Sequence, residues 1–462
     1  MTTSGSITLF PYQEESIQEI DHFGGRALLA LSMGLGKTII SLKWLERHPL
    51  EAYPALVVCP ASIKYNWAYE ALHHLGIRAD ICEGQKPPSG GKGFHTKSKL
   101  TIINRDILKF WVPHLRKMKF QTIVIDESQS FGNPRSQRTK ALKEIVQNVY
   151  HLVALSGTPL TNRPSELWPI LNMLWPEKYQ SFWSFAQTYC SPKLTPWGWD
   201  YSGASNLDQL HNELKQTGMI RRRKEDVLKD LPEKVRRIVP CEMSDPDEYY
   251  QAKNDFVNWL KKNMAHRVRS STRAESLSKV GYLLRLVARL KMRKVVDWAN
   301  SFLEETDEKL ILFCRHTKAI DVLKRRINSK SVIVNGSVTG RNRQAAIEQF
   351  VKDPKTRLFL GNIEAAGTGV DGLQRVASEI GVVELPWTPG ALNQLEDRAH
   401  RIGQVATVFV NFLIAGGTIE EKMCQVLQRK QKTISTVLDG GPNESDLSIH
   451  DELIKTFEGG LE

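Results

Sequence analysis

Two series of short apolar runs, each alternating with stretches of helical periodicity, constrain the fold of this chain most strongly. The predicted strands are 55–59, 100–103, 122–126 and 152–155 in the first series, and 310–314, 332–334, 357–360, 381–385 and 407–412 in the second. The helical stretches between them are 37–47, 64–74, 136–147, 318–327, 343–351 and 391–400. Strands that alternate with helices are typical of parallel sheets. The sequence therefore predicts an α/β fold with two lobes.

The stretch from 164 to about 294 fits neither series, and its pattern is mostly helical. We interpret it as helical insertions around the junction of the lobes. The predicted first lobe is 1–235, with an insertion at about 161–235. The predicted second lobe is 236–440, with a basic helical insertion at about 245–295, and an acidic tail follows at 441–462. A length of 462 residues is ample for two domains.

The net charge of +12 is concentrated in one part of the chain. Residues 261–294 contain eleven basic residues and one acidic residue, a net of +10. A stretch of one sign this long favours contact with a polyanion. The alternative is a basic helix that packs on the lobes with its charge incidental.

The remaining composition indicates the class of protein. The six cysteines are scattered without a C-x-x-C pair, which favours free buried thiols over a metal or disulfide framework. No apolar run approaches the ~20 residues of a membrane span, and the N-terminus lacks a signal-peptide pattern. We expect a cytoplasmic protein, or a nuclear one in a eukaryote, with no membrane contact.

A glycine-rich turn follows the apolar run 27–31 and opens a helix. It reads Gly34-Leu35-Gly36-Lys37-Thr38. Glycines let backbone N–H groups approach phosphates, Lys37 would reach the β- and γ-phosphates, and Thr38 would bind Mg²⁺. The strict phosphate-binding loop has glycine five residues before Gly36, where Leu31 stands here, and such a turn can also be purely structural.

An acidic pair, Asp126-Glu127, ends a predicted strand. Ligands of parallel sheets bind at the carboxyl ends of the strands. Asp126 would hold Mg²⁺, and Glu127 would orient and deprotonate an attacking water. The alternative is an acidic strand end that caps a helix.

Two arginines near the C-terminus, Arg398 and Arg401, are spaced by three and are predicted on one helix face. Arginines neutralise charge on a transferring γ-phosphate. The alternative is a solvent-facing helix with Glu396 and Asp397 as ion-pair partners.

Taken in order, these elements resemble the Swi/Snf-related DNA-translocating ATPases of helicase superfamily two. The resemblance runs nearly end to end. The similar segments are Tyr12-Gln13 (Q motif), 33–38 (motif I), 57–62 with Asn66-Trp67 (motif Ia), 126–129 (motif II), 155–162 (motif III), 310–317 (motif IV), 367–371 (motif V) and 394–404 (motif VI). The resemblance implies two RecA-like lobes, with ATP and Mg²⁺ as cofactors.

The resemblance also implies roles for single residues. The implied nucleotide contacts are Gln13, Gly34, Gly36, Lys37, Thr38, Gly369, Asp371 and Gln394. The implied coupling residues between hydrolysis and movement are Gln129, Ser156 and Thr158. The family usually has histidine where Gln129 stands, so the coupling at this position departs from the family pattern. Motif V reads Gly-Thr-Gly-Val-Asp-Gly where Gly-Leu-Gly-Asn is commoner.

The segments 197–207 and 384–390 resemble the annealing-helicase branch, which remodels replication forks. Trp197, Trp199 and Tyr201 could stack on bases at a junction. They could instead pack the insertion onto the first lobe, and we favour packing.

Contacts with DNA are implied by the resemblance and by the basic stretch. The implied phosphate contacts are Ser62, Lys64, Asn104 and Arg105 in the first lobe, and His316 and Thr317 in the second. Lys261, Arg267 and Arg269 of the basic stretch would grip phosphates without reading bases.

The sequence thus predicts an ATP-dependent, DNA-stimulated translocase on duplex or forked DNA that rewinds or remodels it. The alternatives are a strand-separating DNA or RNA helicase and an ATP-regulated DNA clamp with little turnover. We expect a monomer that a recruiting protein brings to DNA, because targeting domains have no room in this chain.

Overall fold

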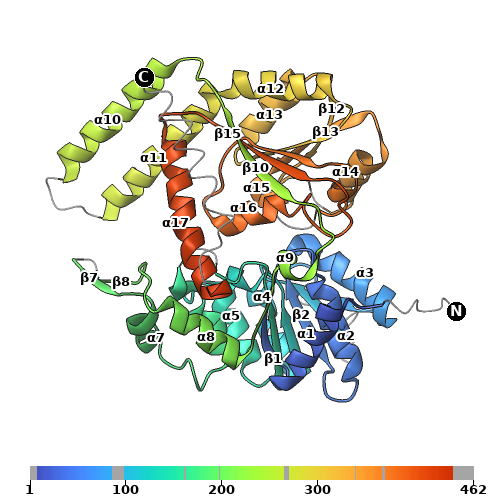
Figure 1. The fold of residues 1–462 in the computed structure, drawn as a ribbon. Coiled ribbons are helices and arrows are strands. Elements are labelled where there is room, and N and C mark those ends of the chain that lie inside the picture. The colour runs from blue at the N-terminus through green and yellow to red at the C-terminus, as the bar shows by residue number, and fades with distance from the viewer. Residues whose placement is uncertain are drawn as a thin grey trace. The chain divides into compact units, whose positions relative to one another are not determined.

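The computed structural model describes residues 8–85, 98–160, 163–196, 198–264, 270–338, 340–366 and 370–440. These residues form two compact units. Unit 1 holds the described residues up to Leu231 and those from Lys430 onward, and unit 2 holds Pro232–Arg429. Each unit has a parallel sheet with helices on both faces (Figure 1), so the predicted α/β class is confirmed.

Unit 1 contains a seven-stranded parallel sheet in the order β3-β4-β2-β5-β6-β1-β9. Its strands are β1 (Arg26–Leu31), β2 (Ala55–Cys59), β3 (Asp80–Ile81), β4 (Leu100–Asn104), β5 (Thr122–Ile125), β6 (His151–Leu155) and β9 (Met219–Arg222). Its helices are α1 (Pro11–His22), α2 (Lys37–Arg47), α3 (Lys64–Leu75), α4 (Leu108–Leu115), α5 (Gln137–Val146), α6 (Trp168–Leu174), α7 (Phe182–Tyr189), α8 (Leu207–Thr217) and α9 (Lys224–Val227). A separate hairpin joins β7 (Lys193–Thr195) to β8 (Gly198–Asp200).

Two apolar cores cover the faces of this sheet. Side chains of α1, α2 and α3 pack on one face, and side chains of α4 to α8 pack on the other. The alternating directions of side chains along each strand supply both cores. The central strands β2 and β5 are buried throughout, which explains why the sequence predicts them as continuous apolar runs.

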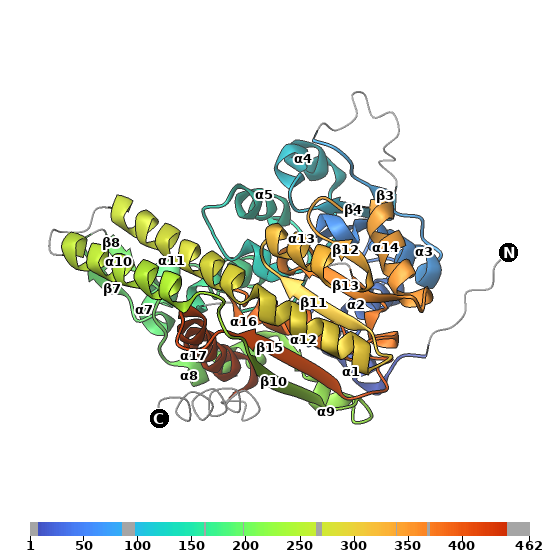
Figure 2. The same ribbon diagram turned by 90° about the horizontal axis from the view of Figure 1, so that it is seen from above.

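Unit 2 contains a six-stranded parallel sheet in the order β10-β15-β14-β11-β13-β12. Its strands are β10 (Lys234–Pro240), β11 (Leu310–Cys314), β12 (Lys330–Val334), β13 (Thr356–Asn362), β14 (Glu379–Val382) and β15 (Val408–Ile414). Its helices are α10 (Pro246–Met264), α11 (Ser270–Leu290), α12 (Met292–Glu305), α13 (Thr317–Arg326), α14 (Gly340–Lys352), α15 (Ile363–Ala366), α16 (Pro389–Glu396) and the first part of α17 (Ile419–Asp439). Helices α10 and α11 lie side by side (Figures 1 and 2).

The division of the chain differs from the predicted boundary after residue 235. The chain enters unit 2 at Pro232, because β10 pairs with β15 of the second sheet. Residues from Lys430 to the end of α17 were expected in the second lobe but belong to unit 1. Their apolar side chains Ile434 and Val437 lie in a core of that unit. The predicted acidic tail, 441–462, lies outside the described residues.

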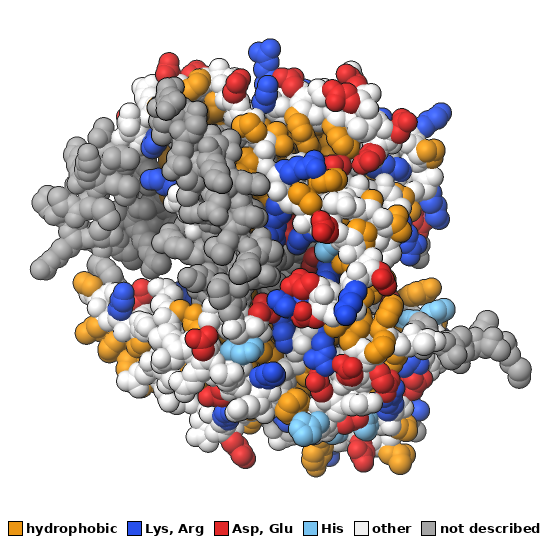
Figure 3. Space-filling model, viewed as in Figure 1, with side chains coloured by type: hydrophobic (Ala, Val, Ile, Leu, Met, Phe, Trp, Pro, Cys, Tyr) orange, Lys and Arg blue, Asp and Glu red, His pale blue; other side chains and the backbone are white. Residues whose placement is uncertain are grey.

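The remaining fold-level predictions can be compared directly. All six cysteines are buried free thiols, as predicted. Among the described residues, no helix is long and apolar enough to cross a membrane. On the visible face, Lys and Arg are interspersed with Asp and Glu (Figure 3).

Candidate functional site

The carboxyl edge of the first sheet brings three predicted motifs together. Strands β5, β6 and β1 are neighbours, and each is followed by a loop that contains one of the predicted motifs. Asp126 follows β5, Ser156 follows β6, and the glycine-rich turn follows β1. Because parallel strands end at the same edge, these loops are adjacent, as expected for a ligand site.

The glycine-rich turn needs glycine for conformation and for space. Gly34 and Gly36 have φ angles of 84° and 79°, in the left-handed region. A Cβ at Gly36 would collide with the amide nitrogen of Gln13. Gln13 Nε2 donates to the Leu35 carbonyl at 3.2 Å, so the predicted Q-motif glutamine holds this turn from beneath.

Lys37 begins α2, and its ammonium points back into the turn. Its Nζ donates to the carbonyl of Leu31 at 2.9 Å and to that of Ser32 at 3.4 Å. A Cβ at Gly157, in the loop after β6, would lie 3.6 Å from this nitrogen. The ammonium is therefore positioned between the first and third motifs.

Asp126 and Glu127 are both buried, with 7% exposure each. Trp67 Nε1 donates to Asp126 at 2.8 Å, and the Glu127 N–H donates to it at 2.9 Å. Burial, and then the charge of Glu127, raise the pKa of Asp126 to about 6, against the opposing effect of Lys37. Glu127 has a φ of 51°, in the left-handed region, which is a strained conformation for a non-glycine residue.

A chain of hydrogen bonds joins the second and third motifs through Gln129. The side-chain amide of Gln129 donates to the carboxylate of Glu127. Its carbonyl oxygen accepts from Ser156 Oγ at 2.6 Å, and Ser156 Oγ accepts from the Thr158 N–H at 3.0 Å. The glutamine side chain thus makes one donor contact and one acceptor contact, which join Glu127 to Ser156. The predicted coupling residues lie in one connected network.

The donor set suits a hard cation. Among the described residues, no group of three or more His, Cys, Asp or Glu side chains could hold a metal ion. One carboxylate, Asp126, and one hydroxyl, Thr38, are oxygen donors of the kind that Mg²⁺ uses together with substrate phosphates and water.

The predicted nucleic-acid residues of unit 1 differ in their environments. Ser62 is exposed in the turn after β2. Lys64 is 6% exposed, and its Nζ donates to the Cys82 carbonyl at 3.1 Å, so it must leave this bond to reach a phosphate. Asn104 accepts from the backbone N–H groups of residues 106 and 107 and therefore shapes its own loop. Arg105 Nε is buried without a hydrogen-bond partner among the described residues.

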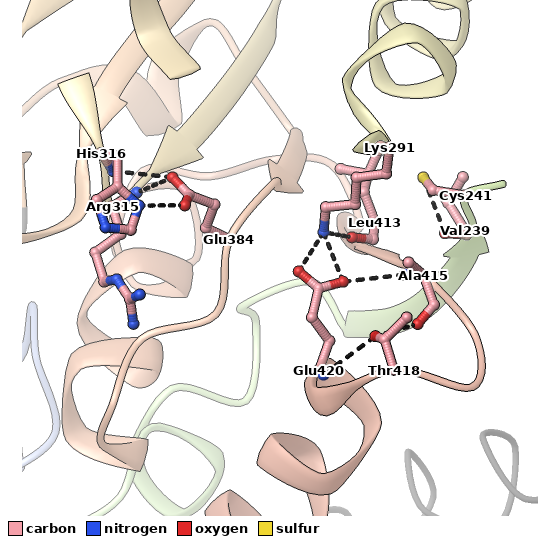
Figure 4. A network of polar contacts seen from close by, with 10 residues as sticks. All are labelled: Val239, Cys241, Lys291, Arg315, His316, Glu384, Leu413, Ala415, Thr418 and Glu420. Carbon is pink, nitrogen blue, oxygen red and sulfur yellow. Dashed lines mark hydrogen bonds and ion pairs between the residues drawn. The ribbon is translucent and has the colours of Figure 1, made fainter. Parts of the chain in front are cut away.

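At the carboxyl edge of the second sheet, Glu384 organises the predicted fourth motif (Figure 4). Its carboxylate accepts from the N–H groups of Arg315 and His316 at 2.9 Å each, and contacts His316 Nδ1 at 2.5 Å. Burial alone would raise the pKa of Glu384, but the bonds from His316 keep it below its ordinary value. Thr317 begins α13 directly after this clamp.

Trp387 lies beside the same clamp and is 48% exposed. The guanidinium of Arg315 stands 4.7 Å from the centre of its ring, a cation–π contact.

The two predicted arginines lie beyond the end of a helix. The predicted helix 391–400 was too long, because α16 ends at Glu396 and a series of turns follows. Arg398 is 5% exposed and donates from Nη1 to the Val370 carbonyl at 2.9 Å. Arg401 is ion-paired with Asp371. The expectation that both arginines share one helix face is therefore wrong.

Of two further predicted nucleotide contacts, Gln394 and Gly369, only Gln394 lies within the described residues. Gln394 lies in α16, and its carbonyl accepts from Arg398 Nε at 3.3 Å. Gly369 lies outside the described residues.

The basic stretch, 261–294, lies only partly within the described residues. The side chain of Lys261 and the whole of Arg267 and Arg269 lie outside the described residues. At the end of the stretch, Lys291 is fully buried and donates to both carboxylate oxygens of Glu420, at 2.6 and 2.8 Å (Figure 4). Arg289 pairs with Glu248. Part of the net charge is therefore balanced inside unit 2.

Two of the three aromatic residues predicted to pack or to stack on bases, Trp199 and Tyr201, lie in β8 and directly after it. Tyr201 packs against the core of unit 1 and contacts Phe182 edge-to-face, with ring centres 4.9 Å apart. Trp199 is 47% exposed and contacts Trp183 at 4.7 Å. Trp197 lies outside the described residues. Tyr201 thus packs on the core as predicted, whereas the side chain of Trp199 is about half exposed to solvent.

Three residues make contacts in the structure that the sequence did not predict. Trp67 bonds Asp126, Glu384 clamps the fourth motif, and Glu396 binds two cations. Each stands inside a motif-like segment, but the sequence gives no signal of its partner, because the partners are distant in the chain.

Two protein-family models and several known proteins match this chain. Residues 18–295 match the SNF2-related domain, and residues 291–403 match the helicase conserved C-terminal domain. The chain is 30% identical to the DNA annealing helicase and endonuclease ZRANB3 of Mus musculus, over 94% of this chain and 41% of that protein. It is 31% identical to the SWI/SNF-related matrix-associated actin-dependent regulator of chromatin subfamily A-like protein 1 of Xenopus tropicalis, over 95% of this chain and 46% of that protein. The chain thus spans less than half the length of these relatives.

Among solved structures, the Sulfolobus solfataricus SWI2/SNF2 ATPase core in complex with dsDNA is 23% identical, with a TM-score of 0.45, over 98% of both chains.

Proposed function

The chain belongs to the family of the SNF2-related domain, and on this premise we propose that it is an ATP-hydrolysing motor that DNA stimulates. The proposed substrate is duplex or forked DNA, along which the motor moves and which it rewinds or remodels. A relative whose name includes "DNA annealing helicase" supports this choice. The proposal includes a monomeric motor that another protein recruits.

The observation that carries the proposal is the meeting of three motifs at one sheet edge. The ends of β5, β6 and β1 bring together three features. These are the carboxylates of Asp126 and Glu127, the hydrogen bonds of Gln129 with Glu127 and Ser156, and the ammonium of Lys37. A carboxylate pair, a lysine and a glycine-rich turn in this order suit phosphoryl transfer to water.

Each residue has a part in the proposed chemistry. Gly34, Gly36 and the start of α2 cradle phosphates, with Gln13 holding the turn. Thr38 and Asp126 would hold Mg²⁺, which supplies positive charge to the phosphates when bound. Lys37 exchanges its bond to the Leu31 carbonyl for a phosphate oxygen.

Glu127 would orient a water and accept its proton. In the structure its carboxylate is already bonded to Gln129, so rearrangement of the Gln129–Ser156 chain would release it. The proposed roles of Arg398 and Arg401 of unit 2 are to neutralise charge on the γ-phosphate, with Asp371 giving up Arg401 in that step. Gly369 and Gln394 stay proposed nucleotide contacts.

For DNA, the proposed contacts lie at the sheet edges of both units. In unit 1 they are Ser62, Lys64, Asn104 and Arg105, which follow β2 and β4. In unit 2 they are His316 and Thr317, with Lys261, Arg267 and Arg269 of the basic stretch. These contacts would be to phosphates, which suits a motor that moves along any sequence.

Steady-state ATP hydrolysis tests the proposal when it is measured without DNA and with single-stranded, duplex and forked DNA. We expect stimulation by duplex or forked DNA that exceeds stimulation by single strands. Stimulation by single strands or RNA alone would instead support a strand-separating helicase. A negligible rate with every nucleic acid, together with ATP-dependent DNA binding, would support a clamp.

A further inference from the structure

Glu396, the last residue of α16, is fully buried and yet binds two cations. Its carboxylate accepts from Lys234 Nζ at 2.6 Å and from Nε and Nη2 of Arg236 at 2.8 Å each. The two bonds from Arg236 form a bidentate fork, the strongest geometry for such a pair. Burial alone would raise the pKa of Glu396, but the two cations lower it to about 2. The carboxylate therefore stays ionised at neutral pH.

The backbone of the same residue supports the turn that carries the two arginines. The carbonyl of Glu396 accepts from the N–H groups of Ala399 and His400, at 3.2 and 3.0 Å. Arg398 and Arg401 stand on either side of these two residues. Glu396 is thus joined to the arginine turn through its main chain and to Lys234 and Arg236 through its side chain.

The partners of the carboxylate lie at the point where the chain enters unit 2. Pro232 is the first residue of that unit, and Lys234 and Arg236 follow on β10. Residues two apart on a strand face the same side, so both cations reach one carboxylate. A second bond runs to the same segment, because His400 Nε2 donates to the Pro232 carbonyl at 2.8 Å.

From these bonds we propose that Glu396 is a positioning residue that fastens the arginine turn to the segment through which the chain passes between the two units. Movement of that segment then shifts Arg398 and Arg401, and the turn cannot reorient independently of it. The proposal rests on the proposed function, in which these arginines act on the bound nucleotide. It adds a named linkage between the segment that joins the units and the arginines.

Glu396→Gln in the full chain tests this linkage, with Glu420→Gln as the matched control. Glu420 is also deeply buried and pairs with a lysine, but its carboxylate bonds go to Lys291 and the Ala415 N–H. At saturating duplex DNA we expect Glu396→Gln to lower kcat about tenfold or more, because small misplacements of catalytic groups have large effects. The KM for ATP and the affinity for a fluorescent ATP analogue should change less than about threefold, since nucleotide-binding residues of unit 1 are untouched. The control should retain kcat.

A milder pair of variants guards against a folding defect. The side chain of Lys234 is 22% exposed, so Lys234→Met and Lys234→Arg should both fold. Lys234→Arg keeps the ion pair and should retain kcat, whereas Lys234→Met should lower it. Wild-type kcat in both Glu396→Gln and Lys234→Met would overturn the proposal, as would an equal loss in Glu420→Gln. Absence of DNA-stimulated turnover in the unmodified chain would instead count against the proposed function.

Discussion

The stability of unit 2 should depend strongly on the carboxylate of Glu396. Its replacement by glutamine keeps the shape of the side chain but leaves Lys234 and Arg236 facing a neutral amide. Because the side chain is fully buried, water cannot replace the lost charge. Removing one partner of a buried ion pair costs about 3–5 kcal/mol.

The pKa of Glu396 gives a second measure of the same effect. Folding lowers this pKa from 4.5 to about 2, so the folded state binds a proton more weakly than the unfolded state does. The resulting stabilisation is complete above the unfolded pKa and is lost as the pH falls through the folded pKa. At about 1.4 kcal/mol for each pKa unit, it is worth about 3 kcal/mol at pH 7. The two measures agree in size.

Urea unfolding of the full chain, wild type against Glu396→Gln, provides the assay. Two compact units can unfold in separate steps, so hydrogen exchange of peptides from β10 and β15 should identify the step that belongs to unit 2. We expect a loss of about 3 kcal/mol in that step at pH 7, and a shrinking difference as the pH falls from about 4.5 towards 3. Equal stability at pH 7, or a difference that stays constant over the acidic range, would show that the ionised Glu396 carboxylate does not stabilise unit 2.

Three further predictions concern unit 1. Gly36→Ala should weaken binding of a fluorescent ATP analogue, because its Cβ would displace Gln13; Gly24→Ala, with a φ of 63° and no atom within 4 Å of the new Cβ, should leave that affinity unchanged. Gln129→Ala should lower kcat about 10- to 100-fold, because it breaks the chain of hydrogen bonds from Ser156 to Glu127 that would hold and then release the carboxylate, while Gln129→His, which keeps a donor and an acceptor, should lose less. Urea unfolding should show that Tyr201→Ala costs about 2–3 kcal/mol and Trp199→Ala less than about 1 kcal/mol, since only Tyr201 packs on the core; equal costs would contradict this.

The parts of the fold that the sequence predicts best are the buried central strands. The predicted bounds of strand 310–314 and helix 37–47 agree with the structure at both ends. The strand is buried on both faces and reads as a continuous apolar run, whereas the helix is buried on one face and shows the apolar spacing of a helix. Strands β9 and β10 escaped prediction. Both are sheet-edge strands rich in arginine, and the arginine side chains have polar partners such as the Ala30 carbonyl and Glu396, which interrupts the apolar pattern.

The sequence could propose which residues form the nucleotide site, but it could not predict the hydrogen bonds and ion pairs that hold them. Lys37 follows β1, Asp126 and Gln129 follow β5, and β6 lies between these two strands in the sheet. The clamp of Glu384 on the fourth motif, and that of Glu396 on β10, join residues more than 65 positions apart. Spacing within a motif carries no information about such partners, so these positioning residues appear only in the structure.

The function proposed for this chain is hydrolysis of ATP through Glu127, accelerated by DNA. The most direct test compares the wild type with Glu127→Gln on duplex DNA, with hydrolysis and DNA binding both measured in the presence of ATP. The account predicts strong DNA-stimulated turnover in the wild type, and loss of turnover by about 100-fold or more in the variant with nucleotide and DNA binding retained. Undiminished turnover in the variant would remove Glu127 from the mechanism, and a wild type that DNA does not stimulate would contradict the account as a whole.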